Sequence, residues 1–558
     1  MIRSLSATLA CSLAGLLGSS ALAGADLTLQ PPAGAPLPAL TDAELALFEA
    51  GRILYSTPLT PEQGLGPIQN KSMCASCHSV PLGGWGNIAV THFGLEDKGS
   101  FDFLEYLGGP LLQTQTIGEN CGEGVPDIAN VVISRVTNSS MAFGMIEAIP
   151  DADIAANADP NDLDGDGVSG RVHWVRPLED GPKSPLRAGR FGWKAQVATV
   201  LSFSADASRN EMGFTNRLIP IENAPNGDID RLADCDLVPD PEDGPDADGY
   251  EFIDRVTHFQ RFLGPPPQTP KSGMTGETIF ASIGCATCHV PAWTTSNDPS
   301  LEEALRGQNI RPYSDFLLHD MGTLADGFPD GDATGQEMRT PTLWNLRSRD
   351  PMLHSGLAAG GTFEDRVRVA IELHGPFGEG ASAAAAFSNL SLFNQQLLIL
   401  FLESLGRLEF DYEVNYKVDL VDFPYFQACF NAGGTVTPDD PCAVGDIDQD
   451  GDVDLVDFAY FEVAYIRDGG AIGDCDGDGI SDLEAILIGI AQDRDGDGIP
   501  DGCNSCPGDI DGDGVVGGPD LTIVLANWGA PGDGDVNSDG TTNGIDLGIV
   551  LAAWGTCP

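Results

Sequence analysis

The chain carries the motif Cys-x-x-Cys-His twice, as Cys74-Ala75-Ser76-Cys77-His78 and as Cys285-Ala286-Thr287-Cys288-His289. In this motif the two thiols can add to the vinyl groups of a haem while the adjacent histidine ligates its iron. A zinc knuckle would need four ligands close together, and a dithiol redox pair does not require the histidine. Two complete copies therefore predict two covalently bound c-type haems, with His78 and His289 as proximal iron ligands.

The N-terminus has the pattern of a secretory signal peptide. Arg3 precedes an apolar run from Leu9 to Leu17, and a small-residue cleavage site follows at Ala21-Leu22-Ala23. The run is shorter than the ~20 apolar residues of a membrane-spanning helix. We expect residues 1–23 to be removed on export, which predicts a periplasmic, cell-surface or secreted protein without a transmembrane segment.

The charge balance is strongly acidic, with 83 Asp and Glu against 28 Lys and Arg and a formal net charge of -55. Binding to nucleic acid needs basic residues that displace counterions from phosphates, so nucleic acid is excluded as a partner. An acidic face would instead attract a basic protein. We expect a small soluble redox protein as the electron donor.

The cysteine count fits an oxidising compartment. Of the 13 cysteines, Cys11 would leave with the signal peptide and four would attach haem. The remainder is even, as expected for disulfides. Cys121 could pair with Cys235, and Cys429 with Cys442, although the sequence leaves the connectivity open.

A chain of 558 residues is too long for one hydrophobic core. Thr41 looks like a helix N-cap, and apolar residues along 44–55 follow one helical face. A similar segment at 275–280 precedes the second motif, so the haem region looks duplicated, and 391–407 forms a strongly apolar helix. We expect a mainly α fold divided into a linker (24–40), two haem domains (41–265 and 266–408), a dockerin-like pair (409–470), calcium repeats (471–507) and a second pair (508–558).

From about residue 411 onward, short Asp/Gly loops alternate with apolar stretches. The loop at 446–457 has carboxylates at positions 1, 3, 5, 7, 9 and 12 and glycine at position 6, an arrangement that surrounds calcium with oxygens. Two later loops repeat it 26 residues apart and continue as LTIVLANWG and LGIVLAAWG. A solvated acidic linker would not keep such a register. The predicted ligands are Asp446, Asp448, Asp450, Asp452, Asp454, Asp457, Asp509, Asp511, Asp513, Asp520, Asp535, Asn537, Asp539 and Asp546.

Parts of this tail resemble known calcium modules. The stretches 474–479 and 493–501 resemble thrombospondin type 3 repeats, and 508–558 resembles a dockerin type I pair, which implies calcium binding and docking to a cohesin. A cell-envelope partner is the alternative. Residues 418–426 (VDLVDFPYF) echo 453–461 (VDLVDFAYF) but lack an Asp/Gly loop. We therefore interpret the first half of the earlier pair as degenerate.

Residues 41–408 resemble the di-haem oxidoreductase family of peroxidase-like proteins, also called thiol oxidoreductases, and more distantly the bacterial di-haem cytochrome c peroxidases. The resemblance rests on CASCHSVPLGG, GRFGWKAQVATVL, NEMGFTN, DFLLHDMGTLADG, MRTPTLWNLRSRDPMLHSG and ELHG. It implies two cytochrome c-like domains and a peroxidase-like enzyme. Electrons would pass from the second haem to the first.

The resemblance also implies roles for two residues between the haem motifs. Trp193 would be the electron relay, and Glu211, 18 residues later, the proton shuttle. The chemistry fits, because a partly buried carboxylate can move a proton between the two oxygens of a peroxide. The alternatives are an ordinary core tryptophan and an ordinary surface glutamate.

The distal iron ligands are less defined. For the second haem the resemblance favours His374, with His319, Met321 and His354 as competitors. For the first, His92 follows His78 by 14 residues and is either a displaceable ligand or a distal polar group. Isolated histidines are also common as structural hydrogen-bonding residues.

A further calcium-type loop lies within the predicted catalytic region, where Asp162, Asp164 and Asp166 precede Gly167. An acidic turn is the alternative.

Two other functions stay open for the whole chain. One is an electron-transfer cytochrome in which both irons have two protein ligands. The other is a surface assembly component in which the calcium-binding tail carries the main function and the haem region is accessory.

Overall fold

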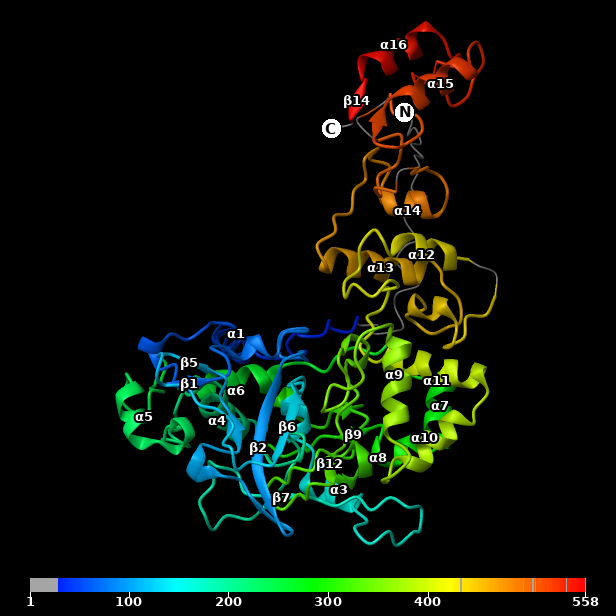
Figure 1. Cartoon of the computed structure of the whole chain (residues 1–558). Coiled ribbons are helices and arrows are strands. Elements are labelled where there is room, and N and C mark those ends of the chain that lie inside the picture. Colours follow the sequence, from blue (N-terminus) through cyan, green and yellow to red (C-terminus); the bar gives the residue numbers. More distant parts are fainter. Residues whose placement is uncertain are drawn as a thin grey trace, which may run out of the picture. The chain divides into compact units, whose positions relative to one another are not determined.

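The computed structural model describes residues 29–431, 434–494, 496–503, 506, 508–537 and 539–556. It divides into two compact units, coloured from blue to yellow-green and from yellow to red in Figure 1. The larger comprises Pro31–Arg407, and the smaller comprises residues 29–30 with the described residues from Leu408 onward. The predicted signal peptide lies outside the described residues. No helix within the described ranges combines the length and hydropathy needed to cross a membrane.

The helices of the larger unit include those expected around both haem motifs. Thr41 is the N-cap of α1, and Glu44 completes a capping box with it. The bounds are α1 (Asp42–Tyr55), α2 (Phe143–Glu147), α3 (Asp151–Ala156), α4 (Val200–Met212), α5 (Ile229–Cys235), α6 (Phe252–Phe262), α7 (Thr275–Ser282), α8 (Cys285–Cys288), α9 (Phe363–Leu373), α10 (Ala381–Ser388) and α11 (Leu392–Ser404).

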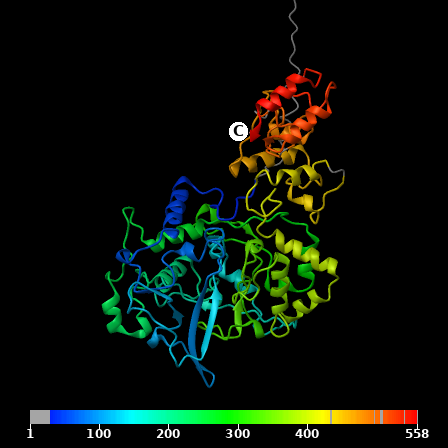
Figure 2. The same ribbon diagram turned by 45° about the horizontal axis from the view of Figure 1, so that its top comes forward.

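The larger unit contains more strands than the predicted mainly α fold would have. The strands of the larger unit are β1 (Ile68–Gln69), β2 (Ala89–Asp97), β3 (Ser100–Asp102), β4 (Leu111–Leu112), β5 (Gln115–Thr116), β6 (Val131–Val136), β7 (Trp174–Val175), β8 (Arg187–Ala188), β9 (Trp293–Thr294), β10 (Asn309–Ile310), β11 (Leu318–Asp320) and β12 (Glu337–Arg339). Strands β3, β2 and β4 form an antiparallel sheet in which β6 also pairs with β2, and Figure 2 shows β2 and β6 side by side from a second direction.

The prediction of a mainly α fold was therefore wrong. The structure is 32% helical and 11% strand. The segments that form β2 and β6, AVTHFGLED and VVISRV, are rich in β-branched and aromatic residues, which favour strands. Much of the remaining chain is irregular, in keeping with 69 Gly and 39 Pro.

Two helix pairs repeat the same packing, one near each haem motif. Gly51 of α1 faces α6 so closely that an added Cβ would lie 2.1 Å from the carbonyl oxygen of Arg255. Gly276 of α7 faces α11 in the same way, 2.0 Å from the carbonyl oxygen of Leu397. Glycine permits such close approach because it has no side chain. Four residues after each glycine an aromatic ring, Tyr55 or Phe280, lies 6.1 Å from the ring of His78 or His289.

The smaller unit consists of short helices, each beginning beside an acidic loop. They are α12 (Phe423–Cys429), α13 (Leu455–Arg467), α14 (Asp482–Leu487), α15 (Gly518–Ala526) and α16 (Gly544–Ala552), and β13 (Val515–Val516) pairs with β14 (Gly555–Thr556). One core forms around Phe426, Phe458 and Phe461, and a separate small one around Val524 and Val550. Modules this small bury little apolar surface, so their folded state usually needs cross-links for its stability.

Disulfides supply such cross-links. Cys121 bonds to Cys235 in the larger unit and Cys429 to Cys442 in the smaller one, as the sequence suggested. A third bond joins Cys475 to Cys503.

Candidate functional site: two cavities that share Trp193

The first haem motif borders a cavity of about 1010 Å³ in the larger unit. Cys74, Cys77 and His78 contribute to its wall. The Nδ1 atom of His78 lies 3.2 Å from the carbonyl oxygen of Gly84, and the ring also has a hydrogen bond to the backbone of Asn138. A backbone contact at Nδ1 is typical of histidines that ligate a metal through Nε2. Burial lowers the pKa of His78 to about 4, so its ring is neutral, as an iron ligand must be.

The second motif borders a separate cavity of about 340 Å³, lined by Cys285, Cys288 and His289 together with His374 at the end of α9. The Nδ1 atom of His289 lies 2.9 Å from the carbonyl oxygen of Tyr313, and that of His374 lies 2.7 Å from the carbonyl oxygen of Ala370. Burial lowers the pKa of both histidines. Two neutral imidazoles with free Nε2 atoms therefore share one cavity.

The cysteines of the two motifs differ from the other cysteines. Cys74, Cys77, Cys285 and Cys288 are free thiols, whereas every other cysteine in the described ranges is in a disulfide. Each free pair lies beside a histidine whose Nδ1 contacts a backbone carbonyl oxygen. This donor set fits a covalently attached haem in each cavity.

Trp193 contributes to the walls of both cavities. Its side chain is 7% exposed, and its Nε1 donates to the carbonyl oxygen of Val136 at 2.9 Å. The indole is thus fixed in one orientation. The indole therefore offers a direct connection through the protein between the two cavities.

Glu211, in α4, lies at the wall of the first cavity. Its Oε2 accepts a hydrogen bond from the side-chain amide of Asn70 at 2.9 Å. Burial raises the pKa of Glu211 to about 7, and the bond from Asn70 opposes the shift. A carboxyl group that titrates near neutral pH can accept and return a proton.

His92, in β2, also lines the first cavity. Its Nδ1 is buried and has no hydrogen-bond partner among the residues that the structure describes. Burial, with the charge of Arg135, lowers the pKa of His92 to about 3, so the ring is neutral. It could serve as a ligand or as a distal polar group, the two roles that the sequence left open.

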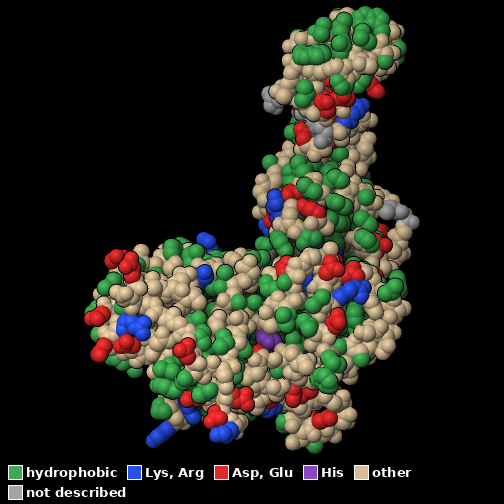
Figure 3. Space-filling view, in the orientation of Figure 1, with side chains coloured by type: hydrophobic (Ala, Val, Ile, Leu, Met, Phe, Trp, Pro, Cys, Tyr) green, Lys and Arg blue, Asp and Glu red, His purple; other side chains and the backbone are tan. Residues whose placement is uncertain are grey.

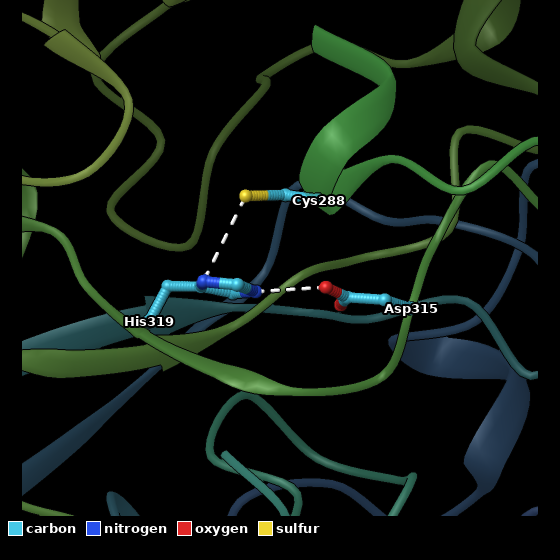
Figure 4. Close-up of side chains that lie close together, drawn as sticks. All are labelled: Cys288, Asp315 and His319. Atoms are coloured by element: carbon cyan, nitrogen blue, oxygen red, sulfur yellow. Dashed lines mark hydrogen bonds and ion pairs between the residues drawn. The ribbon is translucent and has the colours of Figure 1, made fainter. Parts of the chain in front are cut away.

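The other histidines considered for the second cavity differ from His374. Both ring nitrogens of His319 are occupied, by Asp315 at 2.8 Å and Glu379 at 2.7 Å. Burial works against its charge, but these hydrogen bonds raise the pKa of His319 well above the ordinary value. Figure 4 shows its ring between Asp315 and the sulfur of Cys288, 3.7 Å away. His319 is therefore a structural imidazolium, not an available ligand.

His354 and Met321 also line the second cavity. The ring of His354 packs edge-on against Trp193, with the centroids 6.0 Å apart. Burial lowers the pKa of His354 to about 4. Within the described residues, His354 lacks the contact between Nδ1 and a backbone carbonyl oxygen that His289 and His374 share, and Met321 offers only a thioether sulfur.

A family model described as "Di-haem oxidoreductase, putative peroxidase" matches residues 127–405, half of the chain. The chain belongs to this di-haem oxidoreductase family. The matched region contains the second haem motif, Trp193, Glu211 and His374, whereas the first haem motif precedes it. Membership implies two haem groups and a redox function for this oxidoreductase.

Two solved structures align with most of the oxidoreductase at low similarity. A MauG-like protein associated with microbial copper homeostasis shares 16% identity, covering 68% of this chain and 94% of that one with a TM-score of 0.30. Hydrazine synthase of Kuenenia stuttgartiensis, pressurised with xenon, shares 14% identity over 71% and 100%, with a TM-score of 0.26. No curated protein matches the chain. Because both TM-scores are low, we transfer no residue role from either structure.

The acidic loops in the smaller unit of the oxidoreductase share one pattern of hydrogen bonds. In the loop at 446–457, the N–H of Gly451 at position 6 donates to Asp446 at position 1, and the N–H of Ile447 at position 2 donates to Asp457 at position 12. The loops that begin at Asp509 and Asp535 repeat the bond from position 6. These bonds fix the first carboxylate of each loop against the backbone of the turn. The predicted repeat at 493–501 includes Asp495, which lies outside the described residues.

A loop that the sequence analysis passed over has the same pattern. At 411–422, the N–H of Tyr416 donates to Asp411 at 3.3 Å, and the N–H of Tyr412 donates to Asp422 at 2.8 Å. Tyr416 has φ +68°, where the loop at 446–457 has Gly451 at +95°. The spacing of Asp411, Glu413, Asn415, Asp419 and Asp422 at positions 1, 3, 5, 9 and 12 was the available signal. It was missed because the Asp-Gly pair is absent.

The predicted loop in the larger unit lies on the surface. The N–H of Gly167 donates to Asp162 at 3.2 Å, and the N–H of Asp166 donates to Asp164 at 3.2 Å. Asp159, Asp162 and Asp164 each offer a carboxylate oxygen within 4.8 Å of the others. The arrangement suits a cation at least as well as a simple turn.

Proposed function

We propose that this protein is an exported di-haem c-type oxidoreductase of peroxidase type, in which electrons enter at the second cavity and are used at the first. The observation that carries the proposal is the position of Trp193 in the walls of both cavities, each of which has its own Cys-Cys-His set. A haem supplies an iron that cleaves peroxide or accepts electrons, depending on its free coordination position. The residues around each cavity decide which of the two occurs.

In the first cavity, Glu211 would act as the acid and base. As a carboxylate it would take the proton from one oxygen of hydrogen peroxide and return it to the other, which leaves as water when the O–O bond breaks. Two electrons from the donor and two protons from solvent would then release the remaining oxygen as a second water. Asn70 holds the carboxyl group in place through its hydrogen bond to Oε2. His78 would be the proximal ligand in this cavity.

In the second cavity, His289 and His374 would both hold the haem iron. A haem held by two histidines would supply electron transfer and not a reaction with peroxide. Trp193 would carry electrons between the cavities, because its indole is buried and fixed by Val136. A small soluble redox protein is the proposed donor.

The replacement Glu211→Gln tests the proton transfer. It keeps the shape and the bond to Asn70 but cannot take up a proton, so we expect the rate with hydrogen peroxide to fall about 10²–10⁴-fold. The haem content should stay at two per chain. Glu49→Gln, on the exposed face of α1, is the control and should react as the unmodified protein does. An unchanged rate in Glu211→Gln would refute the role.

A second candidate is an electron-transfer cytochrome in which the first iron also has two protein ligands. The buried, unpartnered Nδ1 of His92 in the first cavity favours it. The EPR and optical spectra distinguish the two functions. A high-spin signal, or a reaction with peroxide in the half-reduced protein, supports the enzyme, and two low-spin irons in every redox state support the cytochrome.

For the smaller unit we propose calcium binding at the predicted ligands of all its acidic loops, extended to Asp411, Glu413, Asn415, Asp419 and Asp422. We propose a further calcium ion at the loop that contains Asp162, Asp164 and Asp166. Carboxylates this close repel one another, and burial with this repulsion raises the pKa of Asp446 and Asp448. A divalent cation would relieve that repulsion.

We also propose that the last two loops form a docking module for a cohesin or a cell-envelope protein. Figure 3 shows hydrophobic side chains gathered over α15 and α16. Exposed apolar patches of this kind often mark protein interfaces. A calcium-dependent pull-down with the full chain tests the module, and the double variant Leu525→Asp, Leu551→Asp should abolish it. The exposed members are Leu525, Trp528, Ile545, Leu551 and Trp554.

A further inference from the structure

Two buried arginines line the second cavity without a carboxylate partner. Arg349 is 3% exposed and Arg339 is 5% exposed, and both contribute to the cavity wall. Arg349 donates to two backbone carbonyls at 3.2 and 3.3 Å, and Arg339 to two others at 2.6 and 2.8 Å. Within the part of the chain that the structure describes, neither forms an ion pair within 4.0 Å.

Their charges are not neutralised by the chain itself. A guanidinium removed from water is costly unless an anion replaces the water. Burial, with the neighbouring charge of Arg339, lowers the pKa of Arg349 to about 9. Asp315 partly offsets the charge of Arg339, but its carboxylate already accepts from His319 and from the backbone N–H of Leu317. Asp166 and Glu379 also line the cavity, but in the described part of the chain neither lies within 4.0 Å of either guanidinium.

Arg349 is also held in one place by two indole rings. Its guanidinium carbon lies 3.5 Å from the ring centroid of Trp85 and 5.2 Å from that of Trp193. Such contacts attract a cation but do not cancel its charge. The planar guanidinium is thus preorganised for a ligand with a carboxylate, which it can bind through two parallel hydrogen bonds.

We infer that Arg339 and Arg349 form the anion-binding edge of the second cavity and bind the propionate carboxylates of the haem placed there. This inference rests on the proposed function, which puts haem on Cys285 and Cys288. The inference also gives Arg349 a positioning role, because an anion that Arg349 binds would lie beside Trp193. The propionate edge of the cofactor would then be next to Trp193, which also lines the first cavity.

The test uses the full-length protein with both haems attached and compares Arg349→Gln with Arg349→Lys. Loss of a nearby positive charge favours the oxidised iron, so Arg349→Gln should lower the midpoint potential of the second haem. Arg349→Lys keeps the charge and should lower it less. Arg368→Gln is the control, since Arg368 lies on α9 but pairs with Glu364 outside the cavity. It should leave the potential unchanged.

Spectroelectrochemistry gives the potentials, and peptide mapping with the pyridine haemochrome shows where haem is attached. A potential in Arg349→Gln equal to that of the control, with both haems present, would overturn the inference and leave the proposed function standing. If Arg349→Gln does not retain haem, the low-frequency resonance Raman band of the propionates decides. It should shift between the unmodified protein and Arg349→Lys, and an unshifted band overturns the inference. An unmodified protein without haem on Cys285 and Cys288 would refute the proposed function itself.

Discussion

Three histidines share a local arrangement that separates ligand candidates from structural residues. In His78, His289 and His374, a backbone carbonyl oxygen lies within hydrogen-bond distance of Nδ1, and burial keeps the ring neutral. Such a bond fixes the tautomer and directs Nε2 to a metal. His319 has a carboxylate on each nitrogen instead. The hydrogen-bond partners of each ring therefore distinguish the candidate iron ligands from the structural histidine, which a sequence motif alone does not do.

The pKa of Glu211 predicts a pH dependence of the peroxide reaction. Burial raises this pKa to about 7, and the carboxylate form is the one that accepts the first proton. The rate should therefore fall as the pH drops from about 8 to about 6, with a midpoint near pH 7. Stopped-flow measurements across this range check it. Glu211→Gln should be slow throughout, and the same pH profile in that variant would assign the titration to another group.

At the scale of elements, the close contact of α7 with α11 predicts a strict requirement for glycine. In Gly276→Ala, the new Cβ would meet Leu397 at 2.0 Å and Phe401 at 2.7 Å, so the helices must separate. We expect a loss of about 1–3 kcal/mol in the free energy of unfolding, larger than alanine's gain in helix propensity. Urea unfolding of the holoprotein measures it. Gly181→Ala, with no atom within 4 Å, is the control, and equal midpoints would contradict the prediction.

The loop at 411–422 predicts an unusual stabilising replacement. Tyr416 has φ +68°, a backbone conformation that is strained for a bulky residue, and its side chain is 41% exposed. Tyr416→Gly should raise the stability of the smaller unit by about 1 kcal/mol in the presence of calcium. Gly451→Ala, at φ +95° in the neighbouring loop, should lower it. Calorimetry of the full chain distinguishes them, and a lower midpoint for Tyr416→Gly would refute the prediction.

At the scale of the whole molecule, the acidic loops predict that calcium stabilises the smaller unit, which holds most of them, more than the larger unit, which has the one surface loop with Asp162, Asp164 and Asp166. Ligand binding to the folded state stabilises it by about 2.7 kcal/mol per site at a concentration 100 times Kd. Removal of calcium with EGTA should therefore lower the transition of the smaller unit in calorimetry, while the Soret band of the larger unit stays unchanged. Identical traces with calcium and with EGTA would contradict calcium binding.

The sequence predicted local features better than the architecture. Capping and periodicity predicted the helices α1, α7 and α11. The cysteine count predicted disulfides, and two pairs that the sequence suggested without fixing the connectivity are present. The sheet around β2 was missed because the comparison with cytochrome-like domains outweighed the β-branched residues at 89–97 and 131–136. Distal residues depend on tertiary contacts: the carboxylates on His319 come from Asp315 and Glu379, 60 residues beyond His319. No spacing rule relates such positions.

The separation of free thiols from disulfides has a consequence for how the protein is made. Cys74, Cys77, Cys285 and Cys288 stay unpaired, while the other described cysteines are oxidised. In the oxidising compartment proposed for this protein, haem attachment and disulfide formation would compete for the same kind of sulfur. A vicinal thiol pair oxidises readily unless it is reduced or captured first. Haem attachment would therefore have to precede the oxidation of these thiols. In a host without the attachment system, we expect chains with wrong disulfides to accumulate.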